Sequence, residues 1–441
     1  MIQRNIVFDF SKSTGKLKPV TAVNGAPLIT PSLDVDISDS FREMGVPFVR
    51  THTHPTERVI DIHTVFPNPE LCELFEGSFN FAPTDAYLRS IKDTGAEIFL
   101  RLGESPEPYE IKRYNRPRMT SEKFASVCER IIAHYNEGWG GGMKLGIKYV
   151  EILSSPDTPD GYLENPTEYY SLYRTVANRL RARFPRIKIG AYSANGFHSL
   201  NHYDATDTER KSIDFLEGFL EYITAKDTSA PLDFLSWKCR ADTPEELSLH
   251  TNYARNFLNQ AGLRKTQSIV SEFNLVTDSA PQLARDYPAR LIASLILAQK
   301  SDLSMLFYSS ANPETPDCAL YSLEDRRRVH TYAPYRALTA FASLSKMKNT
   351  VLCTEDYRHT IYSLGATDGE KGAIILATCD YNGIIEITVG GAVFKTYSIR
   401  GIAGGGERGD GFSTSAEGIA LVGDRIRVRA GKHEVYLITL E

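Results

Sequence analysis

The sequence predicts an α/β protein built as a (β/α)₈ barrel followed by an antiparallel β-sandwich. Eight short apolar runs lie between about residues 17 and 345, separated by longer segments of helical period. Continuous apolar runs are typical of parallel strands covered on both faces. After about residue 346, short strands alternate with turns that contain Gly and Asp. We therefore expect a barrel over 17–345 and a sandwich over 346–441, with the N-terminal segment 1–16 as a candidate extra strand of the sandwich.

The predicted barrel strands are short and regularly spaced. They are 18–25, 47–53, 97–105, 148–155, 188–195, 232–239, 267–274 and 305–312. Helical signals lie between them: Asn165 can cap a helix, Pro166 suits its first position, and Glu168 completes a pattern like a capping box. Residues 121–135 place an apolar stripe on one helix face, formed by Phe124, Val127, Cys128, Ile131 and Tyr135.

Composition excludes several classes of function. The formal net charge of −5 over 441 residues argues against nucleic acid as the main partner, which usually requires a basic face. No apolar run approaches the roughly 20 residues that span a bilayer, so no membrane association is expected. The N-terminus lacks signal-peptide features, and the 6 cysteines show no C-x-x-C spacing. Free thiols in a reducing compartment, and hence a cytoplasmic location, are expected.

Polar residues at the strand ends are the candidates for the functional site. Barrel enzymes build their sites at the C-terminal ends of the strands. That rule selects His52, Glu104, Ser155, Asn195, Trp237, Lys238, Glu272 and Tyr308.

Glu272 is the strongest of these candidates. A carboxylate at the end of a buried strand is costly unless it is hydrogen-bonded or used in chemistry. In a retaining glycosidase such a group attacks the anomeric carbon and forms a glycosyl-enzyme intermediate. The alternative is a structural carboxylate that forms an ion pair in the barrel mouth, and the residues alone leave both open.

An ordered series of motifs resembles glycoside hydrolase family 39. The series is VNGAP (23–27), FVRTH (48–52), DIHTVFP (61–67), FLRLGES (99–105), HYNEGWGGG (134–142), SEFN (271–274) and FYSSANP (307–313). The resemblance implies a retaining glycosidase barrel with Glu272 as the nucleophile on strand seven. It also implies a carbohydrate substrate and sugar-pocket roles for Arg50, His52 and Tyr308. Because barrels of this family commonly associate, a homo-oligomer is a candidate assembly.

The chain departs from that family where the chemistry is expected. Ser155 stands at the position of the acid/base Glu on strand four, and Ser154 at that of the preceding Asn, which contacts the sugar. Lys238 replaces a His, and Thr53 lies where relatives often carry an acid. Serine cannot shuttle a proton near neutral pH, and loss of the general acid costs about 10²–10⁴ in rate. Such clustered changes indicate a site that has been rebuilt or retired.

Other polar residues have two interpretations each. Glu104 is a candidate substitute acid or a sugar-binding or structural residue, and Asp157 is a second candidate acid. Glu151 is expected in a buried structural pair. Lys238 could donate a proton or bind an acidic sugar, or it could pair with Glu272 and hold it ionised. Trp237 is either a stacking platform for a sugar or a core residue.

The histidines near strand two allow a metal interpretation. His52, His54 and His63 with Asp61 have ligand types suited to zinc. Asp61 and His63, however, fall in the DIHTVFP segment, where the resemblance requires no metal. No dinucleotide fingerprint is present. The sequence therefore predicts no metal and no cofactor.

The sequence thus predicts a hydrolase for O-glycosidic bonds of a plant-type oligosaccharide that contains arabinose or xylose. Glu272 is its expected nucleophile, and Ser155 replaces the usual acid/base. Two alternatives stay open. One is a carbohydrate-binding pseudoenzyme without catalysis, and the other is a transglycosylase that uses an activated donor.

Overall fold

The computed structural model describes most of the chain. The described ranges are 2–30, 35–52, 58–104, 116–278, 284–312, 320–323, 329–354, 359–403 and 413–441. Thr53 and His54, which the sequence analysis singled out, lie outside these residues.

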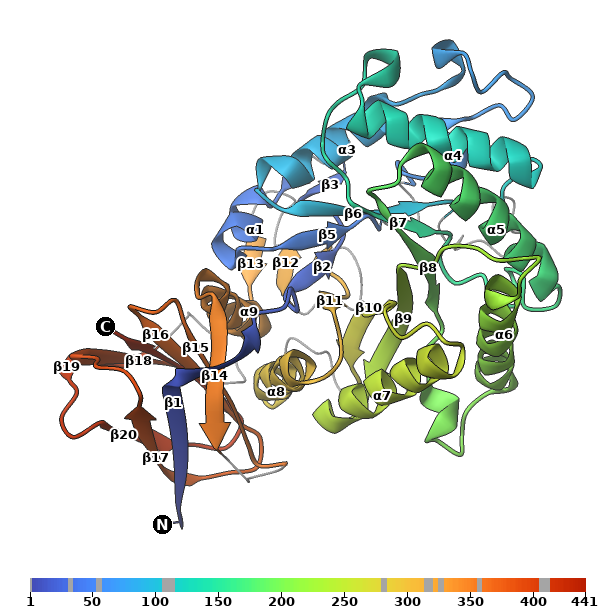
Figure 1. Cartoon of the computed structure of the whole chain (residues 1–441). Coiled ribbons are helices and arrows are strands. Elements are labelled where there is room, and N and C mark those ends of the chain that lie inside the picture. Colours follow the sequence, from blue (N-terminus) through green and yellow to red (C-terminus); the bar gives the residue numbers. More distant parts are fainter. Residues whose placement is uncertain are drawn as a thin grey trace.

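Eight parallel strands close into a barrel within the described residues (Figure 1). In barrel order they are β2 (Ala22–Asn24), β5 (Phe48–Arg50), β6 (Glu97–Leu102), β7 (Tyr149–Ile152), β8 (Lys188–Ala194), β9 (Phe234–Ala241), β10 (Gln267–Leu275) and β11 (Met305–Tyr308). Each coincides with one of the eight predicted runs, so the predicted barrel is confirmed. By this order Glu272 is on the seventh barrel strand, and Ser155 follows the fourth.

Helices surround the barrel and cover its strands (Figure 1). They are α1 (Ser38–Met44), α2 (Ile62–Val65), α3 (Ala82–Asp93), α4 (Ser121–Asn136), α5 (Pro166–Arg183), α6 (Asp207–Thr224), α7 (Pro244–Gln260), α8 (Tyr287–Lys300) and α9 (Ala333–Ser343). The apolar stripe predicted on α4 is confirmed, because all five of its residues are buried.

The predicted cap of α5 is wrong in one detail. Pro166 does occupy the first position of the helix, but the Asn165 side chain accepts no capping hydrogen bond. The Glu168 carboxylate instead accepts a hydrogen bond from Arg116 at 3.1 Å. A complete capping box forms at α6, where Thr206 and Glu209 satisfy each other's backbone N–H groups.

A nine-stranded sheet forms the second part of the molecule. Its order is β19 (Ser413–Ala420), β18 (Thr396–Ala403), β21 (Glu434–Leu440), β16 (Gly372–Thr378), β15 (Ile361–Thr367), β14 (Asn349–Thr354), β1 (Ile2–Lys16), β17 (Gly383–Gly390) and β20 (Arg425–Ala430). The N-terminal strand β1 pairs antiparallel with β14 and parallel with β17. Two small sheets add β3 (Leu28–Thr30) with β4 (Val35–Asp36), and β12 (Tyr321–Leu323) with β13 (Val329–Thr331).

Strand β16 joins the two parts of the molecule because both of its faces are buried. Ile374 and Leu376 contribute to the core inside the sandwich, which also contains Phe8 of β1. Ile375 belongs to the core of the barrel domain, and β16 contacts α8 there. This double burial explains why β16 reads as a continuous apolar run although its neighbours pair with it antiparallel.

Among the helices of the described residues, none is both long and apolar enough to cross a membrane. The apolar stretch 291–298 instead lies within α8, which packs between the barrel and the sheet.

Replacement of Phe8 tests the place of β1 in the sandwich core. Phe8 is fully buried, so Phe8→Ala should lower the free energy of unfolding by about 3–5 kcal/mol. Val7, its neighbour on the same strand, is 42% exposed, and Val7→Ala should cost less than about 1 kcal/mol. Urea denaturation of both variants measures the difference, and equal losses would contradict this assignment.

Candidate active site

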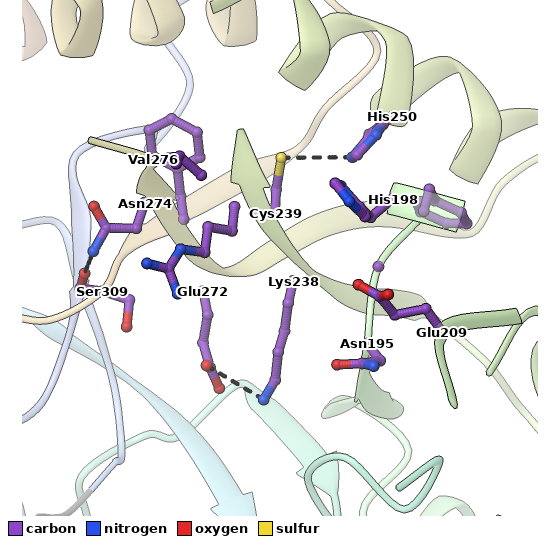
Figure 2. Close-up of a pocket in the computed structure, with 14 residues that line it drawn as sticks. Asn195, His198, Glu209, Lys238, Cys239, His250, Glu272, Asn274, Val276 and Ser309 are labelled. Atoms are coloured by element: carbon purple, nitrogen blue, oxygen red, sulfur yellow. Dashed lines mark hydrogen bonds and ion pairs between the residues drawn. The ribbon is translucent and has the colours of Figure 1, made fainter. Parts of the chain in front are cut away.

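A pocket of about 410 Å³ opens at the C-terminal ends of β8, β9 and β10 (Figure 2). Its lining includes three residues that the sequence selected: Asn195, Lys238 and Glu272. The remaining lining residues are Gly196, Phe197, His198, Glu209, Cys239, Arg240, His250, Phe273, Asn274, Val276 and Ser309. The pocket therefore lies where barrel enzymes place their sites.

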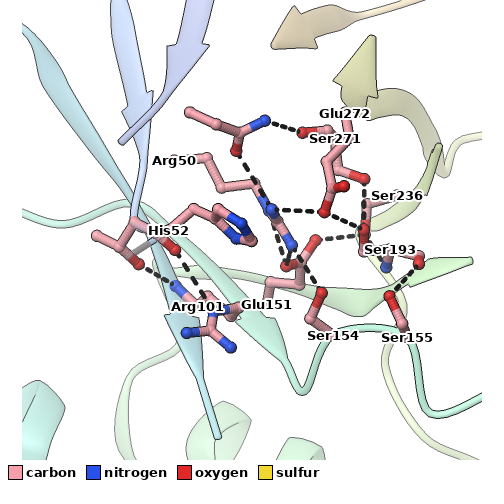
Figure 3. A network of polar contacts seen from close by, with 12 residues as sticks. Arg50, His52, Arg101, Glu151, Ser154, Ser155, Ser193, Ser236, Ser271 and Glu272 are labelled. Carbon is pink, nitrogen blue, oxygen red and sulfur yellow. Dashed lines mark hydrogen bonds and ion pairs between the residues drawn. The ribbon is translucent and has the colours of Figure 1, made fainter. Parts of the chain in front are cut away.

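Glu272 lies between two cations at the edge of this pocket. Its Oε1 accepts a hydrogen bond from Arg50 Nη1 at 3.3 Å, and its Oε2 lies 3.4 Å from Lys238 Nζ (Figures 2 and 3). The Ser193 hydroxyl contacts Oε1 at 3.5 Å. Burial alone would raise the pKa of Glu272, but the charges of Lys238 and Arg50 outweigh it and hold the pKa at about 2. The carboxylate is thus ionised, and 19% of its side chain remains exposed.

Beneath Glu272 lies a fully buried ion pair. Arg50 Nε and Nη2 donate to Glu151 Oε2 at 3.0 and 2.6 Å (Figure 3). Asn24 Oδ1 accepts from Arg50 Nη1 at 3.2 Å, and Ser236 donates to Glu151 Oε1 at 2.6 Å. The predicted buried pair for Glu151 is confirmed. Arg50 has no exposed surface, so in this structure it contacts Glu272 from below instead of facing the pocket.

Two serines occupy the end of the fourth barrel strand. Ser154 accepts a hydrogen bond from Arg50 Nη2 at 3.1 Å, which joins it to the buried pair. Ser155 is 7% exposed, and its hydroxyl donates to the Ser193 carbonyl at 3.4 Å (Figure 3). Its backbone lies in the left-handed region, with a φ of 54°. Neither hydroxyl can replace a carboxylic acid as a proton donor.

Gly103 makes room for the turn after this strand. Leu153 also has a left-handed backbone, with a φ of 62°, and it packs on Gly103. Gly103 has a φ of 126°, which residues with a Cβ rarely adopt, and a Cβ there would lie 3.3 Å from Leu153 Cα. The glycine in FLRLGES is therefore a requirement of the barrel end.

The candidate acid Glu104 lies in a different hollow. Its Oε2 contacts His63 Nδ1 at 2.5 Å, and its Oε1 accepts from the His63 backbone N–H at 3.1 Å. Burial, partly offset by the His63 hydrogen bond, raises the pKa of Glu104 to about 7. It lines a small pocket with apolar residues that include Phe66 and Met119. The structure thus does not bring Glu104 into the lining of the Glu272 pocket.

The second candidate acid, Asp157, is fully buried. Burial raises its pKa to about 6, although the Asn195 backbone N–H donates to Oδ2 at 2.8 Å and lowers it. Asp157 therefore positions the strand end that carries Asn195.

Two predicted ligand contacts are not supported by the positions of the side chains. Trp237 is fully buried, and its Nε1 donates to Ser268 at 2.9 Å, so it has no free face for a sugar. Tyr308 is also fully buried, and its hydroxyl contacts that of Tyr287 at 3.0 Å.

The ligand contact of His52 stays a prediction. The His52 backbone exchanges hydrogen bonds with the Tyr87 hydroxyl, and its partly buried ring lies close enough to Glu272 to feel the charge of that carboxylate. Burial lowers the pKa of His52 to about 3, so its ring is neutral.

The histidines and aspartate with zinc-type side chains near strand two are only partly described, because His54 lies outside the described residues. Asp61 and His63 lie close to Glu104. Asp61 accepts from Arg101 Nη2 at 2.9 Å and lies 3.2 Å from Arg58 Nε, so two arginines already compensate its charge.

The pocket also contains residues that the strand-end rule did not select. His198 and Glu209 follow β8, and His250 is on α7. The rule considers only residues at the strand ends, whereas these side chains come from a 3₁₀ turn and from helices. The spacing of His198 and His202, four residues apart, was the available signal.

Comparisons with known proteins support the fold. No protein-family model matches the chain, and no curated protein sequence matches it significantly. Solved structures do match over almost the whole length. A glucosidase from Croceicoccus marinus is similar with a TM-score of 0.79 at 18% identity, covering 100% of this chain and 99% of that one.

Two further similar structures are glycosidases as well. The GH39 enzyme from Xanthomonas axonopodis pv. citri has a TM-score of 0.72 at 14% identity, with 99% of this chain and 97% of that chain covered. The GH51 α-L-arabinofuranosidase from Thermotoga petrophila has a TM-score of 0.69 at 12% identity, with 99% and 100% covered. At these identities the likeness establishes the barrel-plus-sandwich architecture.

Removal of Lys238 should raise the pKa of Glu272. In Lys238→Met the pKa of Glu272 should rise from about 2 toward the ordinary value of 4.5, because one of the two cations is gone. NMR titration of carboxyl-labelled glutamate measures the pKa, with Glu272→Gln to assign the signal. Lys188→Met, at the start of β8 and the other end of the barrel, is the matched control and should leave the pKa unchanged.

The same contact has a consequence for stability. Because the folded-state pKa is depressed, ionised Glu272 stabilises the fold above about pH 4.5, and this contribution is lost as the pH falls toward 2. The stability difference between wild type and Lys238→Met should therefore shrink over that range. A difference that grows on acidification would contradict the ion pair.

Loss of Arg50 should destabilise the whole barrel. Arg50→Met leaves Glu151 buried without its cation, and the expected cost is about 3–5 kcal/mol. The control is Arg42→Met, because Arg42 pairs with a fully exposed Asp39 and should contribute at most about 1 kcal/mol. Chemical denaturation compares the two, and the double variant Arg50→Met/Glu151→Met should recover part of the loss. Equal costs for both arginines would refute the role of the pair.

Proposed function

We propose that the protein is a retaining glycoside hydrolase with Glu272 as its nucleophile. The observation that carries this proposal is an ionised, partly exposed carboxylate at the end of the seventh barrel strand, beside a pocket of about 410 Å³. The proposed substrate is a plant-type oligosaccharide that contains arabinose or xylose. Similar structures include a β-xylosidase and α-L-arabinofuranosidases, which supports that choice.

The contacts of Glu272 suit the first step of such a reaction. Arg50 binds Oε1 from below and fixes the orientation of the carboxylate. An oxygen of the carboxylate would attack the anomeric carbon, while the bond to the leaving group breaks and its electron pair goes to the leaving oxygen. Water then displaces Glu272 from the glycosyl-enzyme and releases a proton to solvent or to a nearby base. Lys238 would have to move from Oε2 as the sugar binds.

Proton donation to the leaving group is the altered part of this mechanism. A typical retaining site holds two carboxyl groups about 5–5.5 Å apart, and the usual second position is Ser155. We infer that cleavage without protonation is confined to donors with an acidic leaving group, because the sugar hydroxyl released from an oligosaccharide is too weak an acid to depart unprotonated. For an oligosaccharide, Glu104 is the candidate substitute acid, because a pKa of about 7 keeps part of it protonated at neutral pH, and it would have to reach the Glu272 pocket from the neighbouring hollow.

A second candidate function is carbohydrate binding without cleavage. The Lys238–Glu272 contact favours it, since the ammonium group occupies the oxygen that faces the pocket. Such a protein would retain the pocket and its polar lining but would form no product.

Hydrolysis of aryl glycosides with good and poor leaving groups, each with and without azide, tests the proposal. We expect cleavage of the activated substrates and acceleration by azide, which attacks the glycosyl-enzyme without a general base. Glu272→Gln should lower the rate by more than about 10³-fold, because the nucleophile is lost. Glu209→Gln, a second carboxylate in the lining of the same pocket, is the matched control and should retain activity.

The other outcomes separate the alternatives. Full activity in Glu272→Gln would refute the mechanism. Cleavage of poor leaving groups that is lost in Glu104→Gln would identify Glu104 as the acid. Sugar binding without any product would favour the binding protein, and transfer to added acceptor sugars would identify a transglycosylase.

A further inference from the structure

Two histidines and an aspartate form a compact group at the rim of the pocket. The group consists of His198, His202 and Asp204, in the segment between β8 and α6. Its three candidate ligand atoms lie within 4.8 Å of one another. His198 lines the Glu272 pocket itself (Figure 2).

The backbone brings the two imidazole rings together. A short 3₁₀ turn covers His198–Leu200, and the N–H groups of Asn201 and His202 both donate to the His198 carbonyl. One helical turn therefore separates the histidines and puts them on the same side. Their rings stack with centroids 3.8 Å apart.

The orientation of the His202 ring is set by Glu246 of α7. His202 Nε2 lies 2.7 Å from Glu246 Oε1. Glu246 is buried and also accepts hydrogen bonds from the Asp242 backbone N–H at 2.6 Å and from Asn201 Nδ2 at 3.1 Å. A carboxylate oxygen accepts hydrogen bonds, so the Nε2–H of His202 donates to Glu246. Nδ1 is then the ring nitrogen of His202 that can bind an ion.

Asp204 lies near both rings. His202 Nδ1 lies 4.0 Å from Asp204 Oδ1, and His198 Nε2 lies 3.9 Å from the same oxygen. Zinc bonds to nitrogen and oxygen are about 2.0–2.2 Å long, so tetrahedral ligands stand about 3.3 Å apart. Because the stacked rings are nearly parallel, the His198 ring must turn for both imidazoles to point at one ion, and Asp204 must rotate toward it. The side chains of His198 and Asp204 are 31% and 85% exposed, which leaves room for both movements. A carboxylate that orients a histidine ligand through its other nitrogen is a recurrent feature of metal sites.

The alternative group around the same histidine fits an ion less well. His202, Asp242 and Glu246 also lie close together. The 2.7 Å separation of His202 Nε2 and Glu246 Oε1 is a hydrogen bond and is too short for two ligands of one ion.

We propose that His198, His202 and Asp204 bind a divalent transition-metal ion of the zinc type at the rim of the pocket. Two imidazoles and one carboxylate suit zinc better than calcium or magnesium, which prefer oxygen ligands. Three protein ligands leave a position open for water or for a group of a pocket ligand. The proposal does not depend on the glycosidase activity.

Titration of the chelator-treated protein with ZnCl₂, followed by calorimetry, tests the site. We expect one zinc ion per chain, a Co²⁺ adduct with visible d–d absorption of a low-coordinate site, and no comparable binding of Ca²⁺. His198→Ala and His202→Ala should abolish the binding. Glu246→Gln should keep the stoichiometry and weaken the affinity about 10- to 100-fold, because it disturbs only the orientation of His202.

Two further variants keep the test decisive. Asp204→Asn changes an exposed side chain, so a loss of zinc in this variant cannot be ascribed to misfolding. His433→Ala, in the sandwich, is the matched control and should bind zinc as the wild type does. The proposal is overturned if the wild type binds no zinc, or if binding persists in both histidine variants and in Asp204→Asn.

Discussion

The buried pair of Arg50 and Glu151 is the interaction on which the site depends. It joins the second barrel strand to the end of the fourth, and through Asn24, Ser154 and Ser236 it extends to three further parts of the barrel. Desolvation of both charges is expensive and is offset only because each is multiply hydrogen-bonded. One guanidinium nitrogen then remains for Glu272. A rigid interior of fixed charge therefore sets the position of Glu272 at the pocket.

The electrostatic setting of Glu272 has two opposing effects. Arg50 and Lys238 guarantee the ionised form that nucleophilic attack requires. The same cations also bind the lone pairs of Glu272 and lower its basicity. A less basic carboxylate is a weaker nucleophile in the first step of the proposed reaction, but it is a better leaving group in the second step. In the proposed reaction, this balance suits a donor whose first step is easy.

The barrel architecture could be predicted from the sequence, because its strands are buried on both faces and therefore form continuous apolar runs. The sequence was also sufficient for the Glu151 pair, since a carboxylate inside such a strand must have a partner. It left Trp237 open and failed for Tyr308, because alternation along a strand does not say whether an aromatic side chain faces the mouth or the core. It also missed His198 and His202, whose proximity is set by a 3₁₀ turn in a loop. The position of the His202 ring depends on its contact with Glu246 of α7, which is distant in the sequence and which no local sequence pattern encodes.

The pairing of β1 has a consequence for how the chain acquires its structure. β1 precedes the barrel strands in the chain, yet its partners β14 and β17 begin at Asn349 and Gly383. All eight barrel strands leave the ribosome before either partner does. During most of translation β1 is thus an unpaired strand with Phe8 uncovered, a segment that chaperones would bind and that could pair with a neighbouring nascent chain. Pairing β1 with β14 and β17 closes a very long loop, which costs conformational entropy. The folded barrel lowers this cost, because it holds β1 near the start of β14.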